Sequence, residues 1–167
     1  MFREIRIKNR QLTEKDCHEI LNTAEYGTLA TMGDDGYPYA VPVNFIYHNG
    51  NIYFHCAVTG HMLENIHHCP NVSFNVVKDV FAVPILSESK FKRFDTNYNS
   101  VTVFGTAVEV FAEEKQEGLQ VFLKKFLSED AYQIHQEAGM NYIEKSLKRT
   151  KLIKIEILHM TGKRGNM

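Results

Sequence analysis

The sequence predicts a mainly β fold, an antiparallel barrel of about six strands with helices set at its ends. The strands are joined mostly by tight turns, because Asp35-Gly36 and Asn49-Gly50 supply the residues that two-residue hairpins require. No glycine-rich GxGxxG or GxxxxGK turn is present, so a doubly wound parallel sheet is not expected.

Length, charge and cysteine content narrow the class of protein. The 167 residues fit one domain over 1–167, with about ten residues as an N-terminal arm and the last few as a tail. Lys and Arg total 19 against 20 Asp and Glu, without a basic stripe, so no nucleic-acid partner is expected. Three separated cysteines indicate a reducing compartment. Without a signal peptide or an apolar span of roughly 20 residues, we expect a cytoplasmic protein and no membrane partner.

The first helix is expected to start at Thr13 and to end before Gly27. Asp16, three residues after Thr13, completes a short form of the capping box. The apolar residues that share one face are Cys17, Ile20, Leu21 and Ala24. This face should pack on the barrel.

Three strands follow, at 27–32, at about 39–48 and at 52–57. Because hairpin turns separate them, we expect a consecutive antiparallel meander.

In the second half, residues 78–99 show no clear period. The remaining elements are expected as a helix at 60–68, strands at 72–77 and 100–111, a helix at 113–127, a weaker helical segment to Lys148, and a closing strand at 152–160.

Residues 53–66 are the most informative stretch, because they form a buried strand that stops, turns through Thr59-Gly60 and opens a helix. This places His55, Cys56 and His61 around free backbone N–H groups, where a phosphate or another anion can be held. The alternative is that Thr59 simply caps a surface helix. Aromatic residues on the adjoining strands suit a flat heterocycle with a phosphate tail, for which FMN is the natural candidate, although core packing is their commoner role: Phe45, Tyr47, Tyr53 and Phe54.

Two other chemistries are not favoured. His55 and Cys56 are neighbours on a strand, so their side chains point to opposite faces and cannot act as a nucleophile and its base. The cluster of His61, Asn65 and Cys69 has neither HExxH nor Cys-rich spacing, so no metal site is expected. His67 and His68 suit the C-terminus of a helix instead.

Several segments also resemble a known family, in order along the chain: Gly27-Thr28-Leu29-Ala30-Thr31, Gly36-Tyr37-Pro38-Tyr39-Ala40-Val41-Pro42-Val43-Asn44-Phe45, Tyr53-Phe54-His55-Cys56-Ala57-Val58-Thr59-Gly60, Asn71-Val72-Ser73-Phe74 and Tyr98-Asn99-Ser100-Val101-Thr102-Val103-Phe104-Gly105. Together they are similar to the pyridoxamine 5'-phosphate oxidase-like FMN-binding split barrels, in particular the branch of 5-nitroimidazole-resistance (Nim) flavoproteins. The ending Met160-Thr161-Gly162-Lys163-Arg164 is similar to that branch as well. The resemblance covers about residues 9–164.

The resemblance implies a six-stranded antiparallel split barrel that forms a homodimer with FMN at the subunit interface. The strand 40–45 would run along the isoalloxazine ring, with Pro42 and Phe45 on it and with Val43 and Asn44 contacting the polar edge of the ring. The other cofactor-binding residues implied are His55, Cys56, Gly60, His61, Met62 and Ser100. His55 is also the residue that the resemblance implies as catalytic.

One departure from the family concerns the phosphate. The family usually carries two basic residues directly after the glycine, whereas here Gly60 is followed by His61 and Met62. Backbone amides and His61 would then have to hold the phosphate. A cation from elsewhere could assist: Lys92, Arg93 or Lys163.

The sequence therefore predicts an FMN-dependent oxidoreductase that reduces a small organic acceptor of the nitroaromatic type with electrons from NAD(P)H. The alternative is a non-catalytic module that binds or senses a flavin or a haem, favoured by the few acid–base residues and by the missing basic pair. Haem would need an axial ligand such as His61 or His55. Oxidation of pyridoxamine phosphate is not expected, since the extended basic and aromatic C-terminus used by those oxidases is missing.

Overall fold

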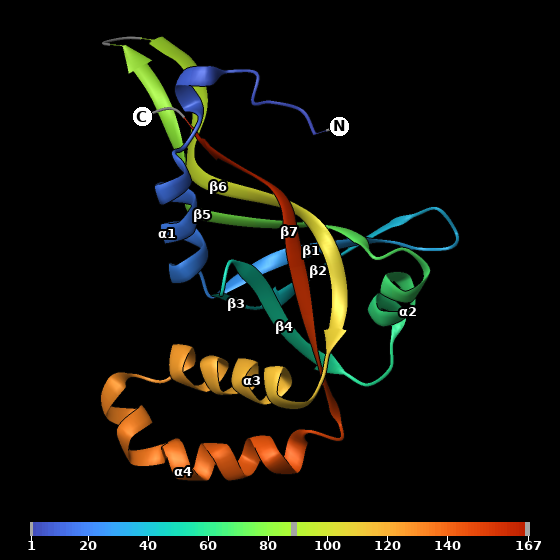
Figure 1. Ribbon diagram of the computed structural model, residues 1–167. Coiled ribbons are helices and arrows are strands. Elements are labelled where there is room, and N and C mark those ends of the chain that lie inside the picture. The colour runs from blue at the N-terminus through green and yellow to red at the C-terminus, as the bar shows by residue number, and fades with distance from the viewer. Residues whose placement is uncertain (1, 88–89, 166–167) are drawn as a thin grey trace.

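The computed structural model describes residues 2–87 and 90–165, so the end of the predicted tail, 166–167, lies outside the described residues. Its strands form one antiparallel sheet in the order β2-β1-β5-β6-β7-β4-β3 (Figure 1). The elements are a 3-10 turn at Lys8–Arg10, α1 Glu14–Thr23, β1 Tyr26–Met32, β2 Pro38–Asn44, β3 Ile46–His48, β4 Asn51–Ala57, α2 His61–His68, β5 Asn71–Ser87, β6 Lys90–Val110, α3 Ala112–Phe126, α4 Glu129–Ser146 and β7 Thr150–Arg164. This confirms a mainly β fold with flanking helices.

The described sheet has seven strands where six were predicted, because the segment expected as one strand at 39–48 breaks at Phe45. β2 pairs with β1, whereas β3 pairs with β4 at the other end of the strand order. The prediction of a three-strand meander is therefore wrong. The Phe45 ring is fully buried, with its centroid 4.9 Å from that of Phe74 in an edge-to-face contact. Because the chain turns into the core at Phe45, the segments before and after this residue, β2 and β3, lie at opposite ends of the sheet.

The start of α1 follows the sequence closely. Thr13 Oγ1 accepts from the Asp16 amide at 3.2 Å, and the Thr13 amide donates to Asp16 Oδ2 at 3.0 Å, which confirms the capping box. The helix buries Cys17, Ile20 and Leu21 against the barrel.

Residues 78–87 and 90–99 extend β5 and β6 into a long hairpin that projects from the barrel (Figure 1), and 88–89 lie outside the described part. Its pairing is irregular, with a register shift between Lys78 and Phe81. Apolar side chains on it are exposed: Val80, Phe81, Leu86, Phe91 and Phe94. Because the described part of this chain buries neither face of the hairpin, the sequence has no alternation there to detect.

The core has two parts. The first fills the barrel and includes Phe54, Phe74 and Val101. The second lies between the outer face of the sheet and the paired helices α3 and α4, and includes Tyr53, Phe122 and Leu152. β4 thus sends alternate side chains into two different apolar layers.

Lys125 of α3 joins three parts of the structure. Its Nζ donates to the carbonyl of Ala24, at the end of α1, at 2.6 Å and to that of Phe45, at the β2–β3 break, at 3.0 Å. The ammonium also lies 4.4 Å from the centroid of the Phe45 ring. These contacts hold the break in place.

We predict that Lys125→Met lowers the free energy of unfolding by about 1–3 kcal/mol, because both carbonyls lose their charged donor. Lys124→Met, at the exposed neighbouring position, should change it by less than about 0.5 kcal/mol. Urea unfolding of the three proteins measures the difference. Equal destabilisation by both substitutions would contradict a structural role for Lys125.

The pKa of Lys125 also implies that the free energy of unfolding depends on pH. Burial lowers the pKa of Lys125 to about 8, whereas in the unfolded chain it titrates near 10.4. Above pH 8 the unfolded chain therefore binds the proton that the folded chain has lost, so the stability should rise between pH 8 and about 9.5. This rise, followed by urea unfolding, should be smaller in Lys125→Met; an identical slope in both proteins would contradict the prediction.

Candidate functional site

A cleft of about 250 Å³ lies where β2 faces the end of β4 and the start of α2. It is lined by Tyr39, Val41, Val43, Cys56, Ala57, Thr59, Gly60, His61, Met62 and Leu63. Tyr39, Val41 and Val43 alternate along β2, so they present one face of that strand. Five of the predicted site residues thus come together here: Val43, Cys56, Gly60, His61 and Met62.

The start of α2 is open toward this cleft. Gly60 is the N-cap residue, with a φ of 140°, and no side chain caps the helix. The Leu63 and Glu64 amides donate to the Gly60 carbonyl at 2.9 and 3.1 Å, but those of His61 and Met62 come too early for an intrahelical acceptor. The alternative in which Thr59 caps the helix is therefore not observed. Two amides and the positive end of the helix dipole remain for an anion.

The side chains of His61 and Met62 have different surroundings. The His61 ring lies 4.5 Å, centroid to centroid, from Tyr39 of β2, tilted by 45°. Met62 is half-buried and packs against the barrel core. Neither Lys nor Arg is among the described residues that line the cleft.

The cations considered as substitutes lie elsewhere in this chain. Lys92 and Arg93 are on the projecting hairpin, where Arg93 pairs with Asp95 at 3.0 Å. Lys163 is on β7, with its Nζ 5.6 Å from the centroid of the Tyr98 ring. The described cleft of one chain is thus lined by neutral groups and an imidazole.

Cys56 and His55 point to opposite faces of β4, as predicted. Cys56 lines the cleft, and burial raises its pKa to about 11, so it is a neutral thiol near pH 7. The His55 ring packs edge-on against Phe122 of α3, with centroids 5.0 Å apart. Burial lowers the pKa of His55, so its imidazole is neutral near pH 7.

His55 lines a second pocket, of about 360 Å³, between β4 and the helices α3 and α4. The whole lining is Asn44, His55, Leu119, Phe122, Leu123, Phe126, Tyr142, Ile143, Ser146 and Thr150. The structure therefore separates His55 and Asn44 from His61 and Cys56. Asn44 also donates to the Glu25 carbonyl at 3.1 Å.

Three further predicted residues line neither pocket. Pro42 is exposed on the other face of β2. The Phe45 side chain is fully buried in the core, and its backbone carbonyl accepts from Lys125. Ser100 is on β6, and its hydroxyl donates to the Lys163 carbonyl at 3.3 Å.

Sequence reasoning missed Tyr39 and Val41 as lining residues, although period-two alternation from Val43 points to both. It also treated Leu119, Phe122, Leu123 and Phe126 only as a helical apolar face. Their helical spacing was visible, but their placement opposite His55 depends on tertiary packing.

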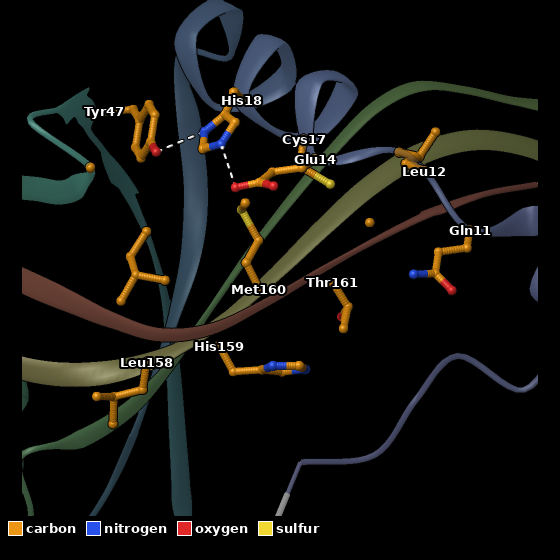
Figure 2. Close-up of a pocket in the computed structure, with 13 residues that line it drawn as sticks. Gln11, Leu12, Glu14, Cys17, His18, Tyr47, Leu158, His159, Met160 and Thr161 are labelled. Atoms are coloured by element: carbon orange, nitrogen blue, oxygen red, sulfur yellow. Dashed lines mark hydrogen bonds and ion pairs between the residues drawn. The ribbon is translucent and has the colours of Figure 1, made fainter.

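A third hollow, of about 470 Å³, lies between α1 and β7 (Figure 2). A hydrogen bond of 2.7 Å joins the Tyr47 hydroxyl to His18 Nδ1, and His18 Nε2 lies 3.4 Å from Glu14. Burial raises the pKa of Tyr47, so its hydroxyl stays protonated. This network ties β3 to α1, and none of the predicted site residues lines the hollow.

No group of three or more His, Cys, Asp or Glu side chains could hold a metal ion within 2–87 and 90–165. None of the helices in the same part of the chain combines the length and the hydrophobicity that a membrane-spanning helix requires.

Comparison with solved structures gives the same fold at low sequence identity. A proposed 5-nitroimidazole antibiotic resistance protein from Bacteroides thetaiotaomicron has a TM-score of 0.70 and 19% identity, covering 94% of this chain and 90% of that one. The flavocytochrome Anf3 from Azotobacter vinelandii has a TM-score of 0.72 and 19% identity, covering 93% and 68%. An FAD-binding protein from Mesorhizobium loti has a TM-score of 0.60 and 19% identity, covering 95% and 97%.

A search of curated protein sequences gave no match. A comparison with protein families matched residues 13–164 to the family described as pyridoxamine 5'-phosphate oxidase, and this match includes every named strand and α-helix of the described chain. The chain therefore has the split-barrel fold and belongs to the pyridoxamine 5'-phosphate oxidase family.

Proposed function

We propose that this protein is an FMN-dependent oxidoreductase that passes electrons from NAD(P)H to a small organic acceptor of the nitroaromatic type. The observation that carries the proposal is the uncapped start of α2, which opens into the cleft between β2 and β4. Family membership and the flavin-binding proteins among the similar folds support a flavin as the ligand. When bound, the flavin would supply the redox chemistry, accepting a hydride from the nicotinamide and delivering the electron pair to the acceptor.

The residues present fit such a group. The His61 and Met62 amides would bind the phosphate, and the aromatic Tyr39–His61 pair would flank it. Val41 and Val43 form an apolar wall for a flat ring. Because β2 pairs only with β1 within the described residues, its other edge leaves backbone N–H and C=O groups for the polar edge of the ring.

A homodimer with the flavin at the interface completes the proposal. The cleft of about 250 Å³ is smaller than the roughly 300–1,000 Å³ of most ligand pockets, so one chain would hold only part of the cofactor. Ser100 and the candidate cations lie outside the cleft of their own chain, so a second copy would be needed to supply them. Exposed aromatic residues of the hairpin, such as Phe81 and Phe94, give a second copy apolar surface to cover.

The alternative is a module that holds a flavin or a haem without turnover. It is favoured by the absence of Asp, Glu, Lys and Arg from the residues that line the described cleft, and by the fold shared with the flavocytochrome Anf3. His61 is exposed and could serve as an axial ligand. A Soret band in place of flavin bands would favour this alternative.

We predict that the purified protein shows flavin absorbance near 370 and 450 nm, and that anaerobic NADH or NADPH bleaches the 450 nm band. Addition of a nitroaromatic acceptor should then restore the band. Bound flavin that neither nicotinamide can reduce would contradict an oxidoreductase fed by these donors.

A second prediction concerns His61. An imidazole carries its charge only toward acidic pH, so FMN should bind more tightly at pH 6 than at pH 8 if His61 assists the amides. His61→Ala should flatten this dependence, while His67→Ala, exposed at the other end of α2, should preserve it. Titration of the flavin-free protein with FMN, followed by flavin fluorescence, measures both. An affinity of the parent protein that does not change with pH would remove His61 from the phosphate subsite.

A further inference from the structure

The pocket between β4 and the two helices has the features of a site for a small organic molecule. Its volume of about 360 Å³ falls within the range of small-ligand sites. Its walls are mainly apolar and aromatic, with polar groups on five side chains: Asn44, His55, Tyr142, Ser146 and Thr150. Such a lining favours a mostly apolar ligand with few polar substituents.

One wall of this pocket is aromatic. The Phe122 and Phe126 rings lie on successive turns of α3, with centroids 6.0 Å apart and planes within 14° of each other. His55 meets Phe122 edge-on, and Phe126 remains 43% exposed. A flat ring can therefore enter past Phe126 and pack on this wall.

The polar groups of the pocket can form hydrogen bonds with a substituent on the ring of a bound ligand. The neutral imidazole of His55 and the Asn44 amide come from the two strands. On the helix side, the Ser146 hydroxyl accepts from Arg149 Nη2 at 3.3 Å, and the Arg149 guanidinium lies 5.9 Å from the centroid of the Tyr142 ring. A guanidinium beside the pocket favours a substituent with negative charge, such as a nitro or carboxylate oxygen.

The pocket also lies next to the proposed flavin cleft. Val43 and Cys56 line the cleft, and their sequence neighbours Asn44 and His55 line the pocket. Neighbouring residues of a strand face opposite sides, so the same parts of β2 and β4 separate the two spaces. β3 pairs only with 51–53 of β4, so the following residues of β4 have an unpaired edge on this side within the described sheet.

We propose that the pocket formed by α3, α4 and β4 binds the organic acceptor, a flat aromatic compound whose nitro or carboxylate group contacts His55 and Asn44. The acceptor role rests on the proposed function, whereas binding in the pocket stands on its geometry alone.

The test uses the flavin-loaded protein and 4-nitrobenzoate as the probe, with cyclohexanecarboxylate as the non-planar control ligand. Saturation-transfer NMR and calorimetry should detect binding of 4-nitrobenzoate and at least tenfold weaker binding of the control. His55→Leu should weaken 4-nitrobenzoate binding roughly tenfold through loss of a hydrogen bond. Failure of the parent protein to bind 4-nitrobenzoate overturns the proposal.

The chain contains no tryptophan, so single tryptophans can both fill and report on the pocket. Leu123→Trp places an indole in the pocket and should weaken 4-nitrobenzoate binding by more than tenfold. Ile134→Trp, 75% exposed on α4 and outside the pocket, is the matched control and should bind as the parent does. A folded Leu123→Trp protein that binds like the parent overturns the proposal.

If Leu123→Trp does not fold, Phe126→Trp at the partly exposed mouth replaces it. Its emission should be quenched by 4-nitrobenzoate at concentrations at least tenfold below those that quench Ile134→Trp, and equal quenching overturns the proposal.

Reduction of the flavin by NAD(P)H without binding of 4-nitrobenzoate overturns this inference and leaves the proposed function intact. Binding in the pocket by a protein that never takes up flavin supports the pocket and contradicts the proposed function.

Discussion

The burial of Phe45 is the constraint on which the rest of the structure depends. Where its ring packs against Phe74, the chain leaves one end of the sheet as β2 and enters the other end as β3. The sheet closes around this crossing, and the gap between β2 and β4 becomes the cleft. Lys125 holds the crossing from outside by donating to the Phe45 carbonyl.

The position of β4 at this gap explains why its neighbouring residues Cys56 and His55 line two different pockets. Alternate side chains of one strand pack into the barrel and under α3 and α4, so neighbouring residues serve different spaces. Cys56 faces the uncapped start of α2, where an anion is favoured. His55 faces an aromatic wall, where a flat apolar ring is favoured. A single strand, β4, therefore lies between a space that favours an anion and a space that favours an apolar ring.

The local parts of this arrangement could be predicted from the sequence, while the tertiary parts could not. The Thr13–Asp16 capping box, the helix that begins after Gly60 and the opposite directions of His55 and Cys56 all follow from short-range rules. The break at Phe45 could not be predicted, because the apolar residues continue through Phe45, Ile46 and Tyr47 without a glycine or proline. Similarly, Phe122 reaches His55 only through the packing of a helix more than 60 residues away in sequence.

The central claim is that the free amides at the start of α2 bind the phosphate of a flavin, and a crystal structure of the protein with FMN tests it most directly. The account predicts phosphate oxygens within about 3 Å of the His61 and Met62 amide nitrogens, with the ring along β2 and a second chain closing the cleft. A phosphate bound anywhere else, or an empty cleft in crystals grown with saturating FMN, would contradict it.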